Sequence, residues 1–285
     1  MSYTVTIAGA TGKTGRHVAA GALARHWAVR AAARRRPPLG TWEPFNWDDA
    51  GTWARAFGGS DAAYLLIPFN HPGAAEATPD LIRAVAGAGV PRIVLLSSLD
   101  AADASPASPL RQAEAALQDL SVRSAILRPT WFLDNFTTGS FAAMTEAGQL
   151  RLPAGDGKIP FIAARDIAEV AVACMADRGP EGVFPLTGPE PISHYQVAAA
   201  LGAALGRPIS YVPTNRGEFI AMMTGLGFGQ GYASFLADAL TALASSGAGI
   251  PVTGTVEQIC GRPPRTADEF AREYAQVSGQ TNIAL

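Results

Sequence analysis

Short apolar segments alternate with amphipathic segments through the first 130 residues of the chain. Apolar runs that predict strands lie at about residues 3–8, 28–34, 44–47, 62–67, 92–97 and 124–127. Patterns that predict helices lie between them, at about residues 13–25, 49–57, 74–88 and 109–120. Strands and helices that alternate at this spacing are typical of right-handed βαβ units and a parallel sheet. We therefore predict a doubly wound α/β fold, with ligands outside the carboxyl ends of the strands.

The pattern changes after residue 130, where glycine, proline and aromatic residues become frequent. Helical patterns at about 167–175, 193–206 and 216–247 outnumber the extended segments at 161–166 and 183–186. Glycines 225, 227, 229 and 231 interrupt the longest helical pattern. We predict two domains: a nucleotide-binding domain over 1–150, and a smaller, mostly helical C-terminal substrate lobe over 151–285 with segments that return to the sheet.

A glycine-rich turn, Gly-Ala-Thr-Gly-Lys-Thr-Gly at residues 9–15, follows the first predicted strand and begins the first predicted helix. Gly9 allows a sharp exit from the strand, Gly12 lets a phosphate approach the backbone, and Gly15 lets the helix pack closely. Such a turn directs backbone N–H groups and the helix N-terminus at a pyrophosphate. It predicts a Rossmann domain whose dinucleotide is bound by Gly9, Thr11, Gly12, Lys13, Thr14 and Gly15.

Three arginines end the second predicted strand, Arg34, Arg35 and Arg36, and no Asp or Glu occurs between residues 1 and 42. An acidic residue at this place would accept hydrogen bonds from the ribose 2′-OH of NAD. A guanidinium group instead suits a 2′-phosphate, because its planar fork binds oxyanions bidentately. We therefore predict NADPH/NADP as the cofactor, with Arg34 or Arg35 as its main contact. The competing interpretation is a solvated loop before Pro37.

The composition of the chain argues against several classes of binding partner. The 285 residues carry a formal net charge of −2, which is not the basic balance of a nucleic-acid-binding protein. No apolar run approaches the 18–20 residues of a membrane helix, and the N-terminus enters a strand too early for a signal peptide. The two cysteines lack metal-ligand spacing. We predict a cytoplasmic monomer or homodimer without a metal, whose partner is a small apolar or aromatic substrate.

Many carbonyl reductases with this fold use a Tyr and a Lys four residues apart, and the lysine lowers the pKa of the tyrosine. This chain has two lysines, Lys13 and Lys158, and neither follows a tyrosine by four residues. Leu110 and Glu114 have the corresponding spacing after the fifth predicted strand. We therefore predict hydride transfer to an acceptor that is already activated, such as an iminium ion or a quinone, or no reaction at all.

Motifs along most of the chain are similar to one family. They lie at 9–15, Arg34, 45–49, 95–98, 127–136, 161–168, 186–190 and 261–266. Together they resemble the NmrA-like atypical short-chain dehydrogenases, and the residues near Trp47 and 130–132 resemble the festuclavine/agroclavine dehydrogenase branch. The resemblance implies NADP held by the glycine turn and Arg34. It implies reduction of an iminium ion in secondary metabolism, or of a quinone or azo dye.

Two other functions stay open at this point. Some members of the family are non-catalytic NADP(H) sensors that bind regulators, and a non-redox cyclase or isomerase could use the same fold. Both would keep the glycine turn, so the turn does not decide between them.

Further candidate site residues follow the later strands. We predict cofactor contacts from Pro68 and Phe69 after the fourth strand, and from Ser97 and Ser98 after the fifth. The predicted catalytic residues are Ser97, Asn135 and Tyr232. Apolar side chains predicted to line the substrate pocket are Trp131, Phe132, Phe136, Phe161 and Met222. His71 and His194 are candidate proton donors, and an exposed loop position is the competing interpretation for each.

Overall fold

The computed structural model describes residues 2–68, 71, 73–246 and 249–283. The chain divides into two compact units, each built from three segments. Unit 1 contains Met1–Thr130, Ala164–Leu186 and Gly254–Pro263, and unit 2 contains Trp131–Ala163, Thr187–Thr253 and Pro264–Leu285. The chain therefore first passes from unit 1 to unit 2 after Thr130, whereas the sequence pattern predicted the domain boundary at residue 150. Two later segments return to unit 1.

Unit 1 contains a parallel sheet of seven strands among the described residues, in the order β3-β2-β1-β4-β5-β6-β9. The strands are β1 (Thr4–Ala8), β2 (Ala28–Ala33), β3 (Thr41–Pro44), β4 (Ala62–Leu66), β5 (Arg92–Leu96), β6 (Arg123–Pro129) and β9 (Gly182–Leu186). The central strands β1, β4 and β5 are buried along most of their length. A parallel sheet covered on both faces requires such nearly continuous apolar strands. The predicted α/β fold is confirmed.

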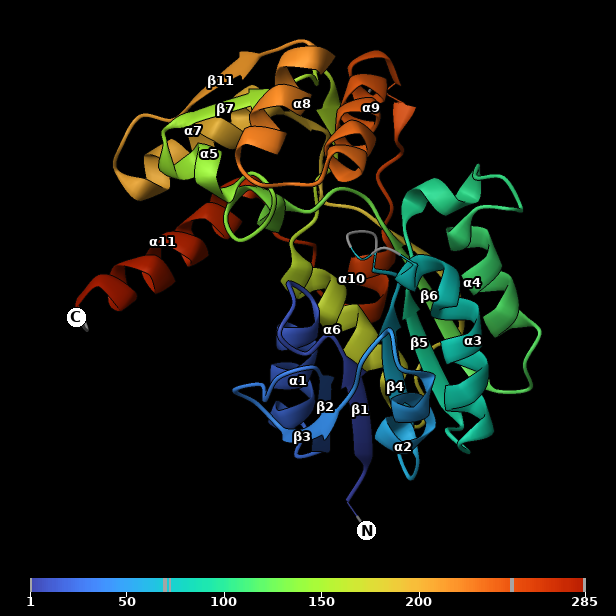
Figure 1. Ribbon diagram of the computed structural model, residues 1–285. Helices are drawn as coiled ribbons and strands as arrows, with labels where there is room; N and C mark the ends of the chain where they lie inside the picture. Colours follow the sequence, from blue (N-terminus) through green and yellow to red (C-terminus); the bar gives the residue numbers. More distant parts are fainter. Residues whose placement is uncertain (1, 69–70, 72, 247–248, 284–285) are drawn as a thin grey trace. The chain divides into compact units, whose positions relative to one another are not determined.

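Two groups of helices cover the two faces of this sheet (Figure 1). One group consists of α1 (Gly15–Ala24), α6 (Ala164–Met175) and α10 (Thr255–Cys260). The other consists of α2 (Trp53–Phe57), α3 (Ala74–Gly87) and α4 (Pro109–Gln118). Short 3-10 turns at Ala50–Thr52 and Leu99–Ala102 complete the connections. The turns that follow β1, β4 and β5 share one edge of the sheet, because neighbouring parallel strands end at the same edge.

One strand lies earlier than predicted. The pattern predicted a strand at 44–47, but β3 covers Thr41–Pro44 and pairs with β2 at the edge of the sheet. Asn46 already belongs to the following turn, where its backbone oxygen accepts from the Trp53 indole at 2.8 Å. Phe45 and Trp47 pack edge to face at 5.2 Å, so the aromatic signal at 44–47 arises from loop side chains.

Unit 2 surrounds its own apolar core, to which Phe136, Phe161 and Phe219 contribute. Its helices are α5 (Ala142–Glu146), α7 (His194–Leu205), α8 (Arg216–Gly225), α9 (Gln230–Ser246) and α11 (Ala267–Ile283), with a 3-10 turn at Leu133–Phe136. Two small sheets pair β7 (Gln149–Leu152) with β11 (Ser210–Pro213), and β8 (Lys158–Ile159) with β10 (Ile192–Ser193). The helical pattern at 216–247 is interrupted between α8 and α9, where glycines cluster.

His194 lies inside this core and not in an exposed loop. It is 1% exposed, stacks on Tyr211 at 5.3 Å, and contacts Phe136 and Phe161 edge to face. Neither ring nitrogen has a hydrogen-bond partner among the described residues. Burial lowers the pKa of His194 from 6.5 to about 4. The ring is therefore neutral at pH 7, and it is not positioned as a proton donor.

This burial makes the stability of unit 2 depend on pH. The pKa of His194 is lower in the folded state, so the unfolded chain binds more protons between pH 6.5 and 4. We expect the free energy of unfolding to fall by about 3 kcal/mol as the pH drops through this range. Urea unfolding at a series of pH values measures this change in the free energy of unfolding. His194→Phe should remove most of this slope, while replacement of the exposed His26 by Asn should retain it; an unchanged slope in His194→Phe would refute the assignment.

Candidate functional site

The glycine turn folds back tightly on the start of α1. Gly9 has a φ of +64°, and an added Cβ would lie 2.7 Å from Leu66 Cδ2. A Cβ on Gly15 would lie 2.1 Å from the Gly9 carbonyl oxygen, and one on Gly12 would lie 3.1 Å from the same atom. Gly15 therefore permits packing of the helix against the turn itself. The amides of Gly12, Arg16 and His17 already donate to carbonyl oxygens within the turn, at 2.8, 3.2 and 2.9 Å. The fit to a dinucleotide pyrophosphate therefore depends on the close approach that the glycines allow and on the N-terminus of α1.

The side chains of the turn differ in their surroundings. Thr14 is 4% exposed, and its hydroxyl accepts a hydrogen bond from the Tyr64 hydroxyl of β4 at 2.8 Å. This bond fixes the turn against the neighbouring strand, so we assign the Thr14 side chain to shaping the site. Thr11 is exposed and Lys13 is half-buried. Their contact with a cofactor stays a prediction.

Arg34, Arg35 and Arg36 follow β2 at the same edge of the sheet, and all three are exposed. Within the described part of the chain, no hydrogen bond or ion pair engages their guanidinium groups. The guanidinium group of an exposed arginine without a protein partner can donate two parallel hydrogen bonds to an oxyanion. The prediction that Arg34 or Arg35 holds the 2′-phosphate is compatible with this placement.

Replacing Arg34 should change the affinity for NADPH much more than the affinity for NADH. For Arg34→Ala we expect the Kd for NADPH to rise about 30-fold and the Kd for NADH to change by about twofold or less, because only NADPH carries the 2′-phosphate. Fluorescence titration of both dinucleotides measures this. Arg36→Ala, two positions further along, serves as the control and should change both values little. Equal losses of NADPH and NADH in Arg34→Ala would contradict the assignment.

A buried carboxylate lies behind the end of β5. Glu114 of α4 is completely buried, and Arg128 of β6 donates to both of its oxygens, from Nε at 2.9 Å and from Nη2. Arg111 adds a bond at 3.2 Å, and the Ser97 hydroxyl donates to Oε1 at 2.7 Å. Burial raises the pKa of Glu114, but the bonds from Arg128 and Ser97 and the arginine charges lower it below its usual value. Glu114 is thus an ionised acceptor with no proton to give.

Sequence reasoning identified Ser97 but not its partner. A signal existed, because Glu114 lies among Leu110, Ala113 and Leu117 on the buried face of a helical pattern. A second missed residue is Thr130, which follows the last residue of β6. Its hydroxyl is buried and has no hydrogen-bond partner in the described part of the chain.

The other residues predicted at this edge have local contacts. The Ser98 hydroxyl caps the following 3-10 turn, because it accepts a hydrogen bond from the Asp100 amide at 3.4 Å. Pro68 is buried and lies two residues after the end of β4. Phe69, also predicted to contact the cofactor, lies outside the described residues.

The predicted substrate-pocket residues belong to unit 2, and they separate into two sets. Phe136 and Phe161 are 1% and 2% exposed and pack edge to face at 5.6 Å. They are core residues, so the pocket prediction now depends on the others. Trp131, Phe132 and Met222 are half-buried and keep part of their surface accessible.

Two predicted catalytic residues also lie in unit 2. Asn135 is half-buried in the 3-10 turn Leu133–Phe136. Tyr232 of α9 is half-buried beside Phe228, and its hydroxyl lies 2.9 Å from the Ser140 hydroxyl. This pair leaves one hydroxyl proton free to donate. The roles of Asn135 and Tyr232 stay predictions.

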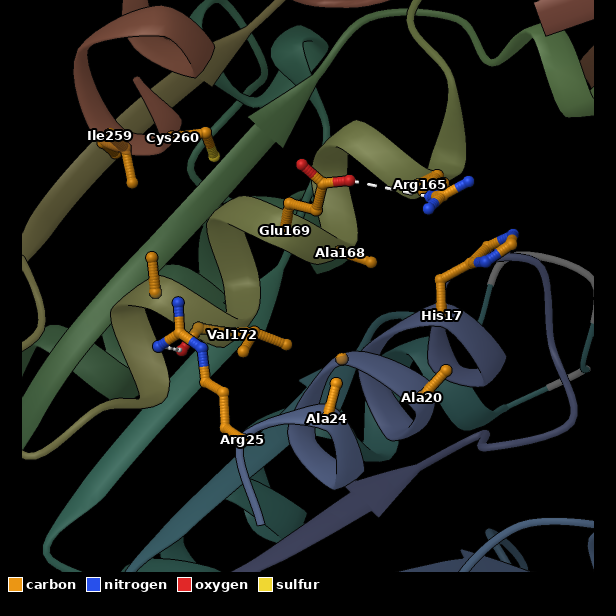
Figure 2. Close-up of a pocket in the computed structure, with 12 residues that line it drawn as sticks. His17, Ala20, Ala24, Arg25, Arg165, Ala168, Glu169, Val172, Ile259 and Cys260 are labelled. Atoms are coloured by element: carbon orange, nitrogen blue, oxygen red, sulfur yellow. Dashed lines mark hydrogen bonds and ion pairs between the residues drawn. The ribbon is translucent and has the colours of Figure 1, made fainter. Parts of the chain in front are cut away.

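A groove of about 440 Å³ lies elsewhere in unit 1, between α1, α6 and α10 (Figure 2). Small side chains such as Ala20 and Ala168 line it, with His17 and Arg165 at one end and Arg25 toward the other. Glu169 interacts with Arg165 at 3.6 Å and also with Arg262, and Arg25 donates to the Val172 carbonyl oxygen at 3.5 Å. The groove contains none of the predicted site residues and presents no charge pattern that selects a ligand.

The fold and the glycine turn define a class, the dinucleotide-binding Rossmann proteins. Residues 9–178 match the NAD(P)H-binding family. The chain is 34% identical over 232 residues to the NAD(P)H azoreductase of Xenophilus azovorans, covering 80% of each chain. It is 32% identical to festuclavine synthase II of Penicillium roqueforti, covering 82% of this chain and 84% of the relative.

Solved structures agree with this result. An NADPH-dependent quinone oxidoreductase of Escherichia coli, in complex with NADPH, superposes with a TM-score of 0.77 at 27% identity, covering 94% of this chain and 99% of the other. The negative transcriptional regulator NmrA in complex with NADP shares the fold, with a TM-score of 0.73 at 18% identity over 99% and 98% of the two chains.

The chain belongs to the NAD(P)H-binding family, and this agrees with the predicted resemblance to the NmrA-like atypical short-chain dehydrogenases. It is an NAD(P)H-dependent oxidoreductase with NADPH/NADP as its cofactor. No helix within the described ranges is long and apolar enough to cross a membrane.

Proposed function

We propose that this reductase transfers hydride to small acceptors that are already electron-poor, such as cyclic iminium ions, quinones and azo compounds, and that it acts in secondary metabolism. The observation that carries the proposal is the bonding of Glu114. It occupies one of the two positions with the spacing of the Tyr/Lys pair, and its oxygens accept four hydrogen bonds. A carboxylate in this state donates no proton. A site without a donor here suits acceptors that need none from the protein.

The relatives support the same range of acceptors. The azoreductase and the quinone oxidoreductase act on acceptors with conjugated N=N or C=O groups. The similarity to festuclavine synthase supports the iminium alternative. These acceptors share one property, a carbon or nitrogen atom that accepts hydride without prior protonation by a strong acid.

Each part of the site has a separate task in this proposal. The turn at 9–15 and Arg34 hold the dinucleotide, which supplies the hydride when it is bound. Ser97 places a hydroxyl oxygen at the end of β5. β5 lies two strands from β1 in the sheet, so the ends of the two strands are about 10 Å apart. For Trp131, Phe132 and Met222 of unit 2, we keep the prediction that their half-buried side chains offer apolar surface to a flat substrate. Alignment of the nicotinamide with the acceptor lowers the barrier to hydride transfer and needs no proton donor.

Isotope transfer tests the proposal directly. NADPH deuterated at the transferring position of the nicotinamide is incubated with the protein and an N-methyl-dihydroisoquinolinium salt. We expect one deuterium on the former C=N carbon of the amine product, detected by mass spectrometry. An unlabelled product, or no product from any of the acceptor classes, would overturn the proposal.

A further inference from the structure

The bonding of Glu114 determines the direction of one hydroxyl group. An ionised carboxylate only accepts hydrogen bonds, so the 2.7 Å contact with Ser97 must use the serine proton. Arg128 and Arg111 also donate to this carboxylate, and Glu114 is completely buried. The Ser97 hydroxyl therefore cannot rotate toward a ligand without leaving a buried charge one bond short.

The Ser97 oxygen keeps free lone pairs. No donor among the described residues reaches this oxygen, and Ser97 is 5% exposed at the carboxyl end of β5. Ligands of doubly wound proteins bind outside these strand ends. At this point the site can accept a hydrogen bond or face a positive charge, but it cannot donate.

We propose that Glu114 is a positioning residue that makes Ser97 a hydrogen-bond acceptor toward the substrate, so that the site prefers cationic or N–H-bearing acceptors to neutral carbonyl compounds. This inference rests on the proposed function, because it names the substrate class of that same site. Ser97 is the residue that touches the substrate, and Glu114 acts through it.

The chemistry of the two substrate classes agrees with this preference. When an iminium carbon accepts a hydride, the C=N π pair moves to nitrogen and a neutral amine forms, so no proton is needed. When a quinone accepts a hydride, negative charge moves to an oxygen, which must then take a proton from water. A lone pair facing the substrate stabilises the cation of the first reaction and repels the developing anion of the second.

Binding to the NADP-loaded protein tests the preference without turnover. The probes are tetrahydroisoquinoline, a cation at neutral pH, and tetralone, a neutral ketone with a similar fused-ring skeleton. We expect the cation to bind about tenfold tighter by calorimetry. In Ser97→Ala the cation should lose about tenfold and the ketone about twofold or less, whereas Ser97→Thr should retain the preference.

Two further variants isolate the role of Glu114. In Glu114→Gln the amide can donate to Ser97 and turn its proton toward the ligand, so the preference should fall to about twofold or reverse. Thr130→Val removes another buried hydroxyl of unit 1, which has no bond to Glu114, and should keep the preference for the cation. If Glu114→Gln does not fold, the serine variants carry the test alone.

The outcomes separate this inference from the proposed function. Equal binding of both probes by the unmodified protein, or equal losses in Ser97→Ala, would overturn the role of Ser97 and Glu114 even if acceptors are reduced. A tenfold preference that Ser97→Ala abolishes, with no turnover of any acceptor, would support the pair and overturn the reductase proposal.

Discussion

Gly15→Ala is expected to lower the affinity for NADPH by about a hundredfold or more, which corresponds to about 2.7 kcal/mol. The added Cβ would lie 2.1 Å from the Gly9 carbonyl oxygen, 2.7 Å from the Gly9 carbonyl carbon and 3.0 Å from the Ala10 Cα. All three are backbone atoms, so no side chain can rotate away to relieve the clash. The turn must move off the start of α1, and the amide groups that face the pyrophosphate move with it.

A matched glycine provides the control for this change. Gly87 ends α3 in the same unit, and a Cβ added there meets no atom within 4 Å. Gly87→Ala should leave the Kd for NADPH unchanged and leave thermal stability equal or slightly higher. Fluorescence titration measures the Kd for NADPH of both variants. If Gly15→Ala binds NADPH as well as the unmodified protein, the turn is not the cofactor site.

Arg92→Met is expected to lower the free energy of unfolding by about 3 kcal/mol. Arg92 of β5 is 1% exposed, and its guanidinium donates to the carbonyl oxygens of Cys174, Asp177 and Gly179 at 3.1–3.2 Å. It also pairs with Glu181 at 3.1 Å. These bonds tie the end of α6 and the turn before β9 to the middle of the sheet. Methionine would fill the space but leave the carbonyl groups without donors.

Arg123 provides a comparison at the same turn. It donates to the Asp177 carbonyl and carboxylate, but 41% of its side chain is exposed. Water can replace these bonds, so Arg123→Met should cost about 1 kcal/mol or less. Urea unfolding followed by circular dichroism measures both variants. Similar losses in the two would contradict the view that burial gives Arg92 its importance.

The parts of the fold that were predicted correctly share one property. The strands β1, β2, β4, β5, β6 and β9 are apolar runs between turn residues, so each carries its own signal. The four small strands of unit 2 do not. β7 pairs with β11 about sixty residues further along, and such short strands form only because tertiary packing brings them together. The helix α11 was missed although Thr266 and Glu269 form a capping box at its start.

The site was predictable to the same extent. The glycine turn is local in sequence, and its strand–turn–helix context was sufficient to place it. The partners of Ser97 and Thr14 come from other elements, α4 and β4, so nothing in the local sequence shows that their hydroxyls are already bonded. Phe136 and Phe161 illustrate the same difficulty, because an aromatic ring that follows a strand can line a pocket or fill a core.

The most direct test of the proposed activity is NADPH consumption at 340 nm with the unmodified protein and a panel of cyclic iminium salts, quinones and azo dyes. We expect turnover with at least one of these classes, and a preference for NADPH over NADH that Arg34→Ala removes. Tight binding of NADPH with no turnover of any acceptor would contradict it.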